Sequence, residues 1–159
     1  MSASLAGHGQ GVVAVIRTAE QQRAQQAWEA LTDRFGEAPD DWKSSKGAKA
    51  YLTALRQTST RVHVSGLGQA LAFLRSRDND GKMAATDLAG AVLTDLGLPE
   101  GDDPALELIS KIKDGDLILL MRATEEGLAY VSWLSRYLQG AGIEPDDVIE
   151  EDNAGEGGN

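Results

Sequence analysis

The chain has 159 residues, of which 42% are apolar and 25% are charged, and its 25 acidic side chains outnumber the 15 basic ones. A chain of this length and composition is expected to form one globular domain around one hydrophobic core. It contains no cysteine, which excludes disulfide bonds, thiolate metal sites and cysteine nucleophiles.

The N-terminal part of the chain predicts a long helix over residues 12–35. Apolar side chains from Val12 through Trp28 to Phe35 recur at helical spacing, glutamines fill the opposite side, and Gly36 ends the pattern. The first residues have no basic segment of a signal peptide, and the apolar run 12–16 is too short to cross a bilayer. We therefore expect a soluble, cytoplasmic protein.

A second helix is predicted from a cap at Asp40 or Asp41 to about Thr60. Its apolar side chains gather on one side, and three basic residues fall on the opposite side. These three form a predicted basic ridge: Lys46, Lys49 and Arg56.

The ridge belongs to a longer stretch, Trp42 to Arg77, that contains no Asp or Glu at all. The stretch holds His63 and seven Lys or Arg residues. A net-acidic protein that excludes acids from one segment favours a negatively charged partner there, with phosphate as the leading candidate. The alternative is a chance distribution of charge on a solvated face.

A third helix is predicted to begin at a Ser65 cap, with apolar residues from Leu67 to Leu74 on its core side. Small residues on another side would let a second backbone approach closely, and they are the candidate protein-docking surface: Gly68, Ala72 and Ser76. Residues 78–81 predict a turn, and a fourth helix is expected over about residues 83–96.

Two more helices are predicted, over about Pro104–Lys113 and Asp116–Leu138. The last has an apolar stripe from Leu117 and Met121 to Leu138, with the three- and four-residue alternation of a helix bundle. Residues 144–159 hold seven acids and no base, and without them 18 acids face 15 bases. We expect an all-α bundle of about six helices over residues 1–142 and an acidic, disordered tail over 143–159.

Two segments resemble known motifs but lack residues that those motifs need. The glycines after Val62–Val64 resemble the start of a dinucleotide-binding fingerprint, but Leu71 replaces its third glycine and no βαβ pattern surrounds it. Residues 76–87 resemble a calcium loop that begins with Ser76 and ends with Asp87, where Asp and a bidentate Glu are needed. No nucleophile–base pair and no metal-binding set stands out, so we expect neither an enzyme nor a cofactor.

Three blocks resemble the small subunit of type III-B (Cmr-type) CRISPR effector complexes. They are the glycine-leucine block Gly66–Ser76, the C-terminal block Arg122–Leu128 continued by Trp133–Tyr137, and the opening helix Glu20–Ala27. Together they cover most of residues 18–140 in the family's order. The family usually has a Pro and a Met or Ile where this chain has Thr60–Val64, which leaves the local backbone there in question.

The resemblance implies an all-helical, non-catalytic subunit that stacks in several copies beside the backbone subunits and helps hold target RNA along the guide RNA. Lysine and arginine would then meet the RNA backbone, because base pairing with the guide reads the sequence. With Arg136 added from its place in the C-terminal block, the candidate RNA-binding residues are Lys46, Lys49, Arg56, Arg61, Arg75, Arg77 and Arg136. The alternative is a helical protein-interaction scaffold that makes no direct RNA contact.

Overall fold

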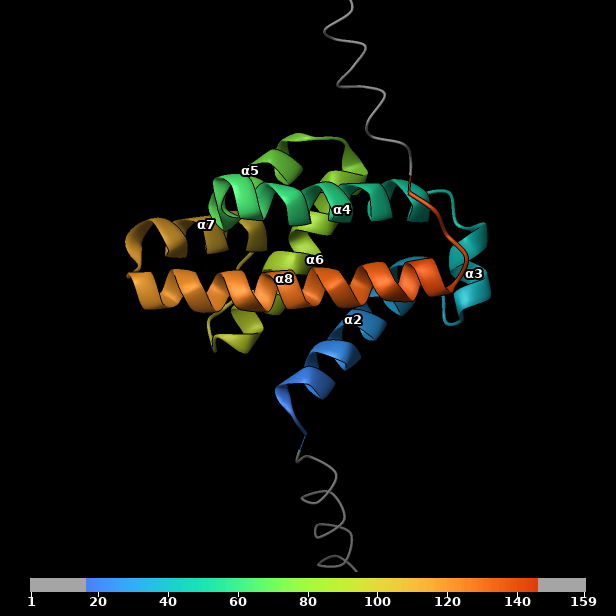
Figure 1. The fold of residues 1–159 in the computed structure, drawn as a ribbon, viewed down its shortest axis with the longest axis horizontal. Coiled ribbons are helices and arrows are strands. Elements are labelled where there is room, and N and C mark those ends of the chain that lie inside the picture. The colour runs from blue at the N-terminus through green and yellow to red at the C-terminus, as the bar shows by residue number, and fades with distance from the viewer. Residues whose placement is uncertain (1–16, 146–159) are drawn as a thin grey trace, which may run out of the picture.

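A computed structural model describes residues 17–145 of the chain, and every regular element in that range is a helix (Figure 1). The bounds are α2 Ala19–Phe35, α3 Pro39–Ser44, α4 Ala48–Ser65, α5 Leu67–Ser76, α6 Asn79–Asp95, α7 Pro104–Asp114 and α8 Leu117–Gly140. The predicted all-α fold is confirmed. The described range holds seven helices instead of six, because the helix expected from residue 40 to 60 is divided.

The longest helix, α8, runs across the whole width of the bundle (Figure 1). In this view α4 lies along one side of α8, α2 crosses on the other side, and α6 packs behind. The core is built from leucines of these helices, including Leu52, Leu88 and Leu134, each fully buried. Burial of such side chains stabilises a fold by about 1.5–3 kcal/mol each, so the packed faces hold the helices in place.

The break between α3 and α4 separates two helices that the sequence pattern joined. Pro39 is the first residue of α3 and Ala38 its N-cap, so the predicted cap at Asp40 or Asp41 is wrong. Ser45 is extended, and the chain turns so that Trp42 is fully buried while its indole N–H donates to the Gly36 carbonyl at 2.7 Å. Burial of the largest side chain outweighs an unbroken helix here.

The predicted cap at Ser65 is also wrong, because Ser65 is the last residue of α4. The β-branched run before it is helical because Val62, only 6% exposed, continues the buried side of α4. Gly66 then separates α4 from α5 with a φ of +88°, a conformation that a residue with a Cβ rarely adopts.

The corner between α5 and α6 is shorter than predicted. Residues 79–81 are already helical, because Asp78 caps α6 by accepting a hydrogen bond from the Gly81 N–H at 3.0 Å. A Cβ at Gly81 would lie 2.7 Å from the Leu74 carbonyl oxygen and 2.9 Å from the Arg77 Cβ. The corner closes only because position 81 has no side chain.

Both ends of the predicted apolar pattern differ from the structure. Helix α2 begins at Ala19 with Thr18 as its cap, so residues 17 and 18 are not helical, and residues 12–16 lie outside the described range. At the start of α8, Leu117 is 69% exposed and Met121 is 62% exposed, so these two are not core residues. The core contacts of α8 come instead from Ala123 onward.

A partly buried ion pair links the helices. Arg34 of α2 donates two hydrogen bonds, both 2.7 Å long, to the carboxylate of Asp87 on α6, and the Tyr51 hydroxyl donates to the same carboxylate at 2.8 Å. Burial raises the pKa of Tyr51 well above its usual value, so its hydroxyl stays protonated as a donor. This cluster fixes α2, α4 and α6 relative to one another.

Candidate nucleic-acid interface

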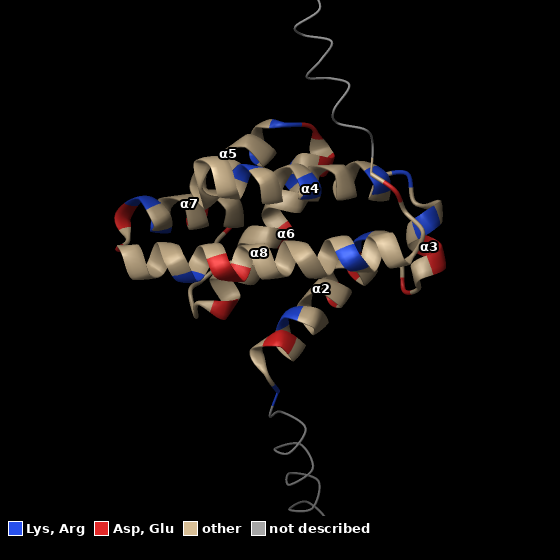
Figure 2. Ribbon diagram, viewed as in Figure 1, with Lys and Arg blue, Asp and Glu red and all other residues tan. Residues whose placement is uncertain are grey.

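The first half of the acid-free stretch presents its cations to solvent. Lys49 and Arg56 are exposed on α4, seven residues or about 10.5 Å apart along the helix. Lys46 is exposed too, but it lies in the turn before α4, so the predicted ridge spans a turn and a helix rather than one helix. Neither Lys46 nor Arg56 forms an ion pair with any residue in 17–145. Figure 2 shows α4 with basic segments and no acidic one.

The second half of the stretch uses its arginines within the fold. The Arg61 guanidinium lies 3.4 Å from the centre of the Phe73 ring, and the Arg77 guanidinium lies 5.7 Å from the same ring. Arg77 also donates a hydrogen bond to the side chain of Gln57. The Arg61–Phe73 contact attaches α4 to α5 through cation–π attraction, and the hydrogen bond from Arg77 to Gln57 links the same two helices.

Arg75 is paired as well. Its guanidinium donates to a carboxylate oxygen of Asp103, the N-cap of α7, at 2.7 and 3.1 Å. The hydrogen bonds from Arg75 lower the pKa of Asp103 below its usual value. Arg61, Arg75 and Arg77 therefore already have named partners within the described chain.

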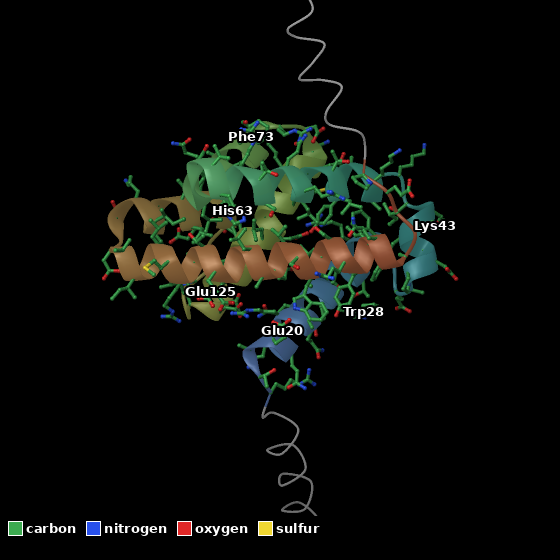
Figure 3. All side chains as sticks on the ribbon, in the orientation of Figure 1. Glu20, Trp28, Lys43, His63, Phe73 and Glu125 are labelled. Carbon is green, nitrogen blue, oxygen red and sulfur yellow. The ribbon has the colours of Figure 1, made fainter. Side chains whose placement is uncertain are left out.

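Two further cations lie outside the ridge. Arg136 is exposed on α8, and no acidic residue of the described range is paired with it. Lys43 is exposed at the α3 end of the bundle, and its Nζ would lie 3.3 Å from a Cβ at Gly142 (Figure 3). Lys43 belongs to the acid-free stretch but not to the predicted RNA-binding set, and its position beside the C-terminal turn could not be seen in the sequence.

The predicted docking residues on α5 have different environments. A Cβ at Gly68 would meet Ile112 of α7 at 3.7 Å, so Gly68 faces a helix of the same chain. Ala72 and Ser76 are exposed. Gly68 thus faces the Ile112 side chain of α7 rather than a closely approaching backbone, and Ala72 and Ser76 are the two positions open to a partner.

The calcium-like loop is engaged in other contacts, since Asp78 caps α6 and Asp87 binds Arg34 and Tyr51. Across residues 17–145, no group of three His, Cys, Asp or Glu side chains is placed to hold a metal ion. No helix within that range is both long and apolar enough to span a membrane.

Sequence analysis missed a cluster of aromatic side chains at the junction of α2, α3 and α8. Trp28, which the helical pattern placed in the core, is 38% exposed and contacts the rings of Trp42 and Tyr137 with centroids 5.0 and 5.3 Å apart. Trp133 lies one turn before Tyr137, with ring centroids 5.4 Å apart. The spacing of Trp133 and Tyr137 was the available signal, because residues four apart share a helix face.

Residues 19–141 match the family model described as "CRISPR-associated protein (Cas_Cmr5)". The chain belongs to the Cmr5 family. It is similar to the "CRISPR system Cmr subunit Cmr5" of Thermus thermophilus, with 29% identity over 124 residues that cover 78% of this chain and 96% of the relative.

The fold agrees with this assignment. The X-ray crystal structure of a CRISPR-associated Cmr5 family protein from Thermus thermophilus matches with a TM-score of 0.61 and 29% identity, covering 80% of this chain and all of that one. The resemblance drawn from the sequence blocks is therefore confirmed, and this Cmr5-family chain is the small subunit of a Cmr-type, type III-B CRISPR complex.

Proposed function

We propose that this Cmr5-family subunit is a non-catalytic scaffold that helps hold target RNA against the guide RNA. It would stack with copies of itself beside the backbone subunits and contact RNA through Lys46, Lys49, Arg56 and Arg136, here called the basic surface. Within the assembly, other subunits would perform RNA cleavage.

The observation that carries this proposal is the exposure of the α4 cations in a segment free of acids. Lys46 and Arg56 keep their charge available, since no carboxylate of the described chain neutralises them. Long, exposed cations spaced along a helix suit the repeating phosphates of an RNA backbone and need no base contact. Arg136 extends the same chemistry onto α8, which packs beside α4.

Arg61, Arg75 and Arg77 have a smaller expected part in RNA binding. Each would have to give up a ring, amide or carboxylate partner before it could contact phosphate. We propose that their main role is to hold α4 against α5 and α5 against α7. Any contribution of theirs to RNA binding would be smaller.

The test is a triple alanine variant, Lys46→Ala, Lys49→Ala and Arg56→Ala, compared with a control of equal charge change. The control replaces three exposed cations elsewhere, Lys82, Lys113 and Arg122, with alanine. Removal of one phosphate-binding cation should reduce the slope of log K against log salt by roughly 0.7–0.9. The first variant should therefore lose about two units of slope within the assembled complex, while the control should lose little.

Two results would contradict the proposal. Equal losses in both triple variants would mean that net charge, not the basic surface, controls RNA affinity. Loss of the subunit from the complex with unchanged RNA affinity would favour the alternative of a protein-interaction scaffold, with Ala72 and Ser76 as its exposed docking residues.

A further inference from the structure

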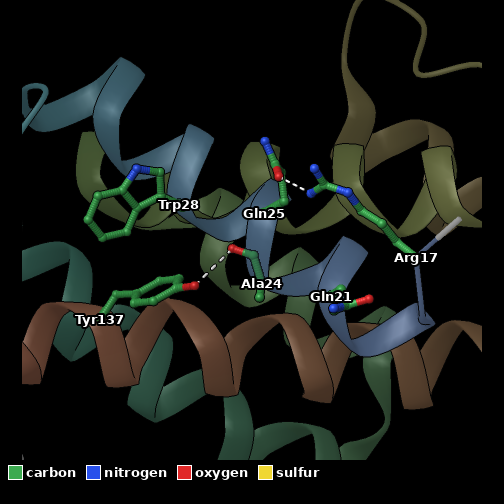
Figure 4. A pocket seen from close by; sticks show the side chains of 6 residues that line it. All are labelled: Arg17, Gln21, Ala24, Gln25, Trp28 and Tyr137. Carbon is green, nitrogen blue, oxygen red and sulfur yellow. Dashed lines mark hydrogen bonds between the residues drawn. The ribbon is translucent and has the colours of Figure 1, made fainter. Parts of the chain in front are cut away.

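A cleft of about 360 Å³ is lined by residues of α2 and α8 and by Arg17, just before α2 (Figure 4). Helix α2 crosses α8 on the side away from α4 (Figure 1). The aromatic rings of Trp28 and Tyr137 stand at one end, and Arg17 lies at the other (Figure 4). Gln21, Ala24 and Gln25 line the space between them. The volume is near the lower limit of about 300 Å³ for small-molecule sites, which suits one flat group better than an extended ligand.

Trp28 differs from the other two tryptophans of the chain. The indole N–H of Trp42 donates to the Gly36 carbonyl, and that of Trp133 donates to Glu20 at 3.0 Å. Trp28 has no hydrogen bond in the described structure, although 38% of it is exposed. It is held in place by edge contacts with Trp42 and Tyr137, so an accessible ring is fixed at the end of the cleft without being enclosed.

The polar groups of the cleft are mainly donors. The Gln21 side-chain carbonyl oxygen accepts from the Thr18 N–H at 2.9 Å, which leaves its amide N–H groups for other partners. Arg17 donates to Gln25 and keeps further N–H groups, since guanidinium has five. None of the six lining residues carries a carboxylate. The nearby Glu20 and Glu29 accept hydrogen bonds from Trp133 and Gln25.

A ring face, unpaired N–H donors and a cation together suit a group that is flat, rich in acceptors and joined to a negative charge. We propose that this cleft binds one unpaired nucleobase of single-stranded RNA, which stacks near Trp28 and Tyr137 with its phosphate toward Arg17. The inference rests on the proposed function, because it adds a base contact to a subunit whose basic surface contacts phosphates. Arg136, adjacent in sequence to Tyr137 on α8, belongs to that surface.

Stacking on an aromatic side chain is sequence-tolerant and is largely independent of salt, unlike phosphate contacts. The two kinds of site can therefore be separated in one experiment. The probes are an oligouridylate of about 12 nucleotides and a ribose-phosphate oligomer of equal length that lacks its bases. Binding of both is measured at several salt concentrations, with the full-length chain and with the assembled complex.

We expect Trp28→Leu to bind the oligouridylate about tenfold more weakly with an unchanged salt slope, and to bind the abasic oligomer as the wild type does. Trp28→Phe keeps a ring and should recover most of the affinity, which separates stacking from a loss of fold. Met121→Ala, which removes an exposed apolar side chain near the other end of α8, is the control and should change neither affinity.

The outcomes distinguish the two proposals. If Trp28→Leu binds oligouridylate normally while the triple variant of the basic surface loses salt slope, the cleft proposal is wrong and the proposed function stands. If Trp28→Leu weakens both oligomers equally, or if Trp28→Phe is no better than Trp28→Leu, no base stacks there. If the Trp28→Leu chain no longer assembles into the complex although its RNA affinity is unchanged, the cleft holds a protein side chain. Absence of RNA binding by the wild type in both settings would overturn both proposals.

Discussion

The two halves of the acid-free stretch use the same kind of residue in different ways. From Trp42 to Thr60 the cations are exposed, whereas from Arg61 to Arg77 the arginines contact a ring, an amide or a carboxylate. A count of charges in the sequence treats these halves alike. The comparison teaches that cations close together in the sequence can differ in how strongly the fold engages them, and the following experiments test that difference.

The largest expected effect concerns a cation with a partly buried partner. Arg34→Ala removes both hydrogen bonds to Asp87 and leaves that carboxylate, whose side chain is 14% exposed, with Tyr51 as its partner. Loss of one member of such a pair should lower the free energy of unfolding by about 3 kcal/mol. Urea denaturation measures this change. The control is Arg56→Ala, on the exposed side of α4, which should lower the free energy of unfolding by less than about 0.5 kcal/mol. Equal losses of unfolding free energy in the two variants would contradict the distinction between cations paired within the fold and exposed cations.

A smaller effect is expected at Arg75, whose ion pair with Asp103 is more than one-third exposed on both sides. Arg75→Ala should lower the free energy of unfolding by about 0.2–1 kcal/mol and leave the salt slope of RNA binding unchanged. A reduced slope would place Arg75 with the RNA-contacting cations instead.

The same variant has a signature in its pH dependence. The pKa of Asp103 is lowered in the folded state, so the contribution of the pair is present above the ordinary carboxyl pKa and is lost as pH falls through the lowered one. Below pH of about 4, stability should therefore decline less steeply in Arg75→Ala than in the wild type. Thermal unfolding across a pH range of about 2–6 measures the difference, and parallel curves would contradict it.

The smallest expected effect comes from the acidic segment. Residues 146–159 lie outside the described range, so the predicted disordered tail remains a prediction. The described chain ends beside the start of α4 (Figure 1), and Ile143 is buried, so the chain should be shortened after Pro145. Removing the six acids of this segment makes the net charge less negative and should strengthen non-specific RNA binding at low salt by roughly a factor of three. Unchanged or weaker binding would show that this segment does not screen the basic surface.

Much of the fold could be predicted because helical periodicity is a local property. Helix α7, for example, begins at Pro104 as expected and extends one residue beyond its predicted end. The errors occurred where distant contacts decide the local structure. The α3–α4 break depends on the burial of Trp42, and the continuation of α4 to Ser65 depends on the burial of Val62. The residues that bury these two side chains cannot be identified from a short window of sequence.

The candidate site was less predictable than the fold. Periodicity separates an apolar side from a polar one, but it does not tell which apolar positions are buried, and the exposed Leu117, Met121 and Trp28 are examples. Pairing across helices was equally hidden, since Arg75 and Asp103 are 28 residues apart. The exposed cations of α4 followed from composition alone, whereas the cleft required α2 and α8 to be placed side by side.

The corner at Gly81 has a consequence for how this sequence can vary. Any side chain there would overlap the Leu74 carbonyl oxygen, a backbone atom that cannot rotate away as a flexible side chain can. In a library of variants selected for a folded subunit, position 81 should return glycine alone, whereas the adjacent exposed Lys82 should return many residue types. The tightest restriction on substitution thus falls at a helix corner that contributes nothing to the basic surface or to the cleft.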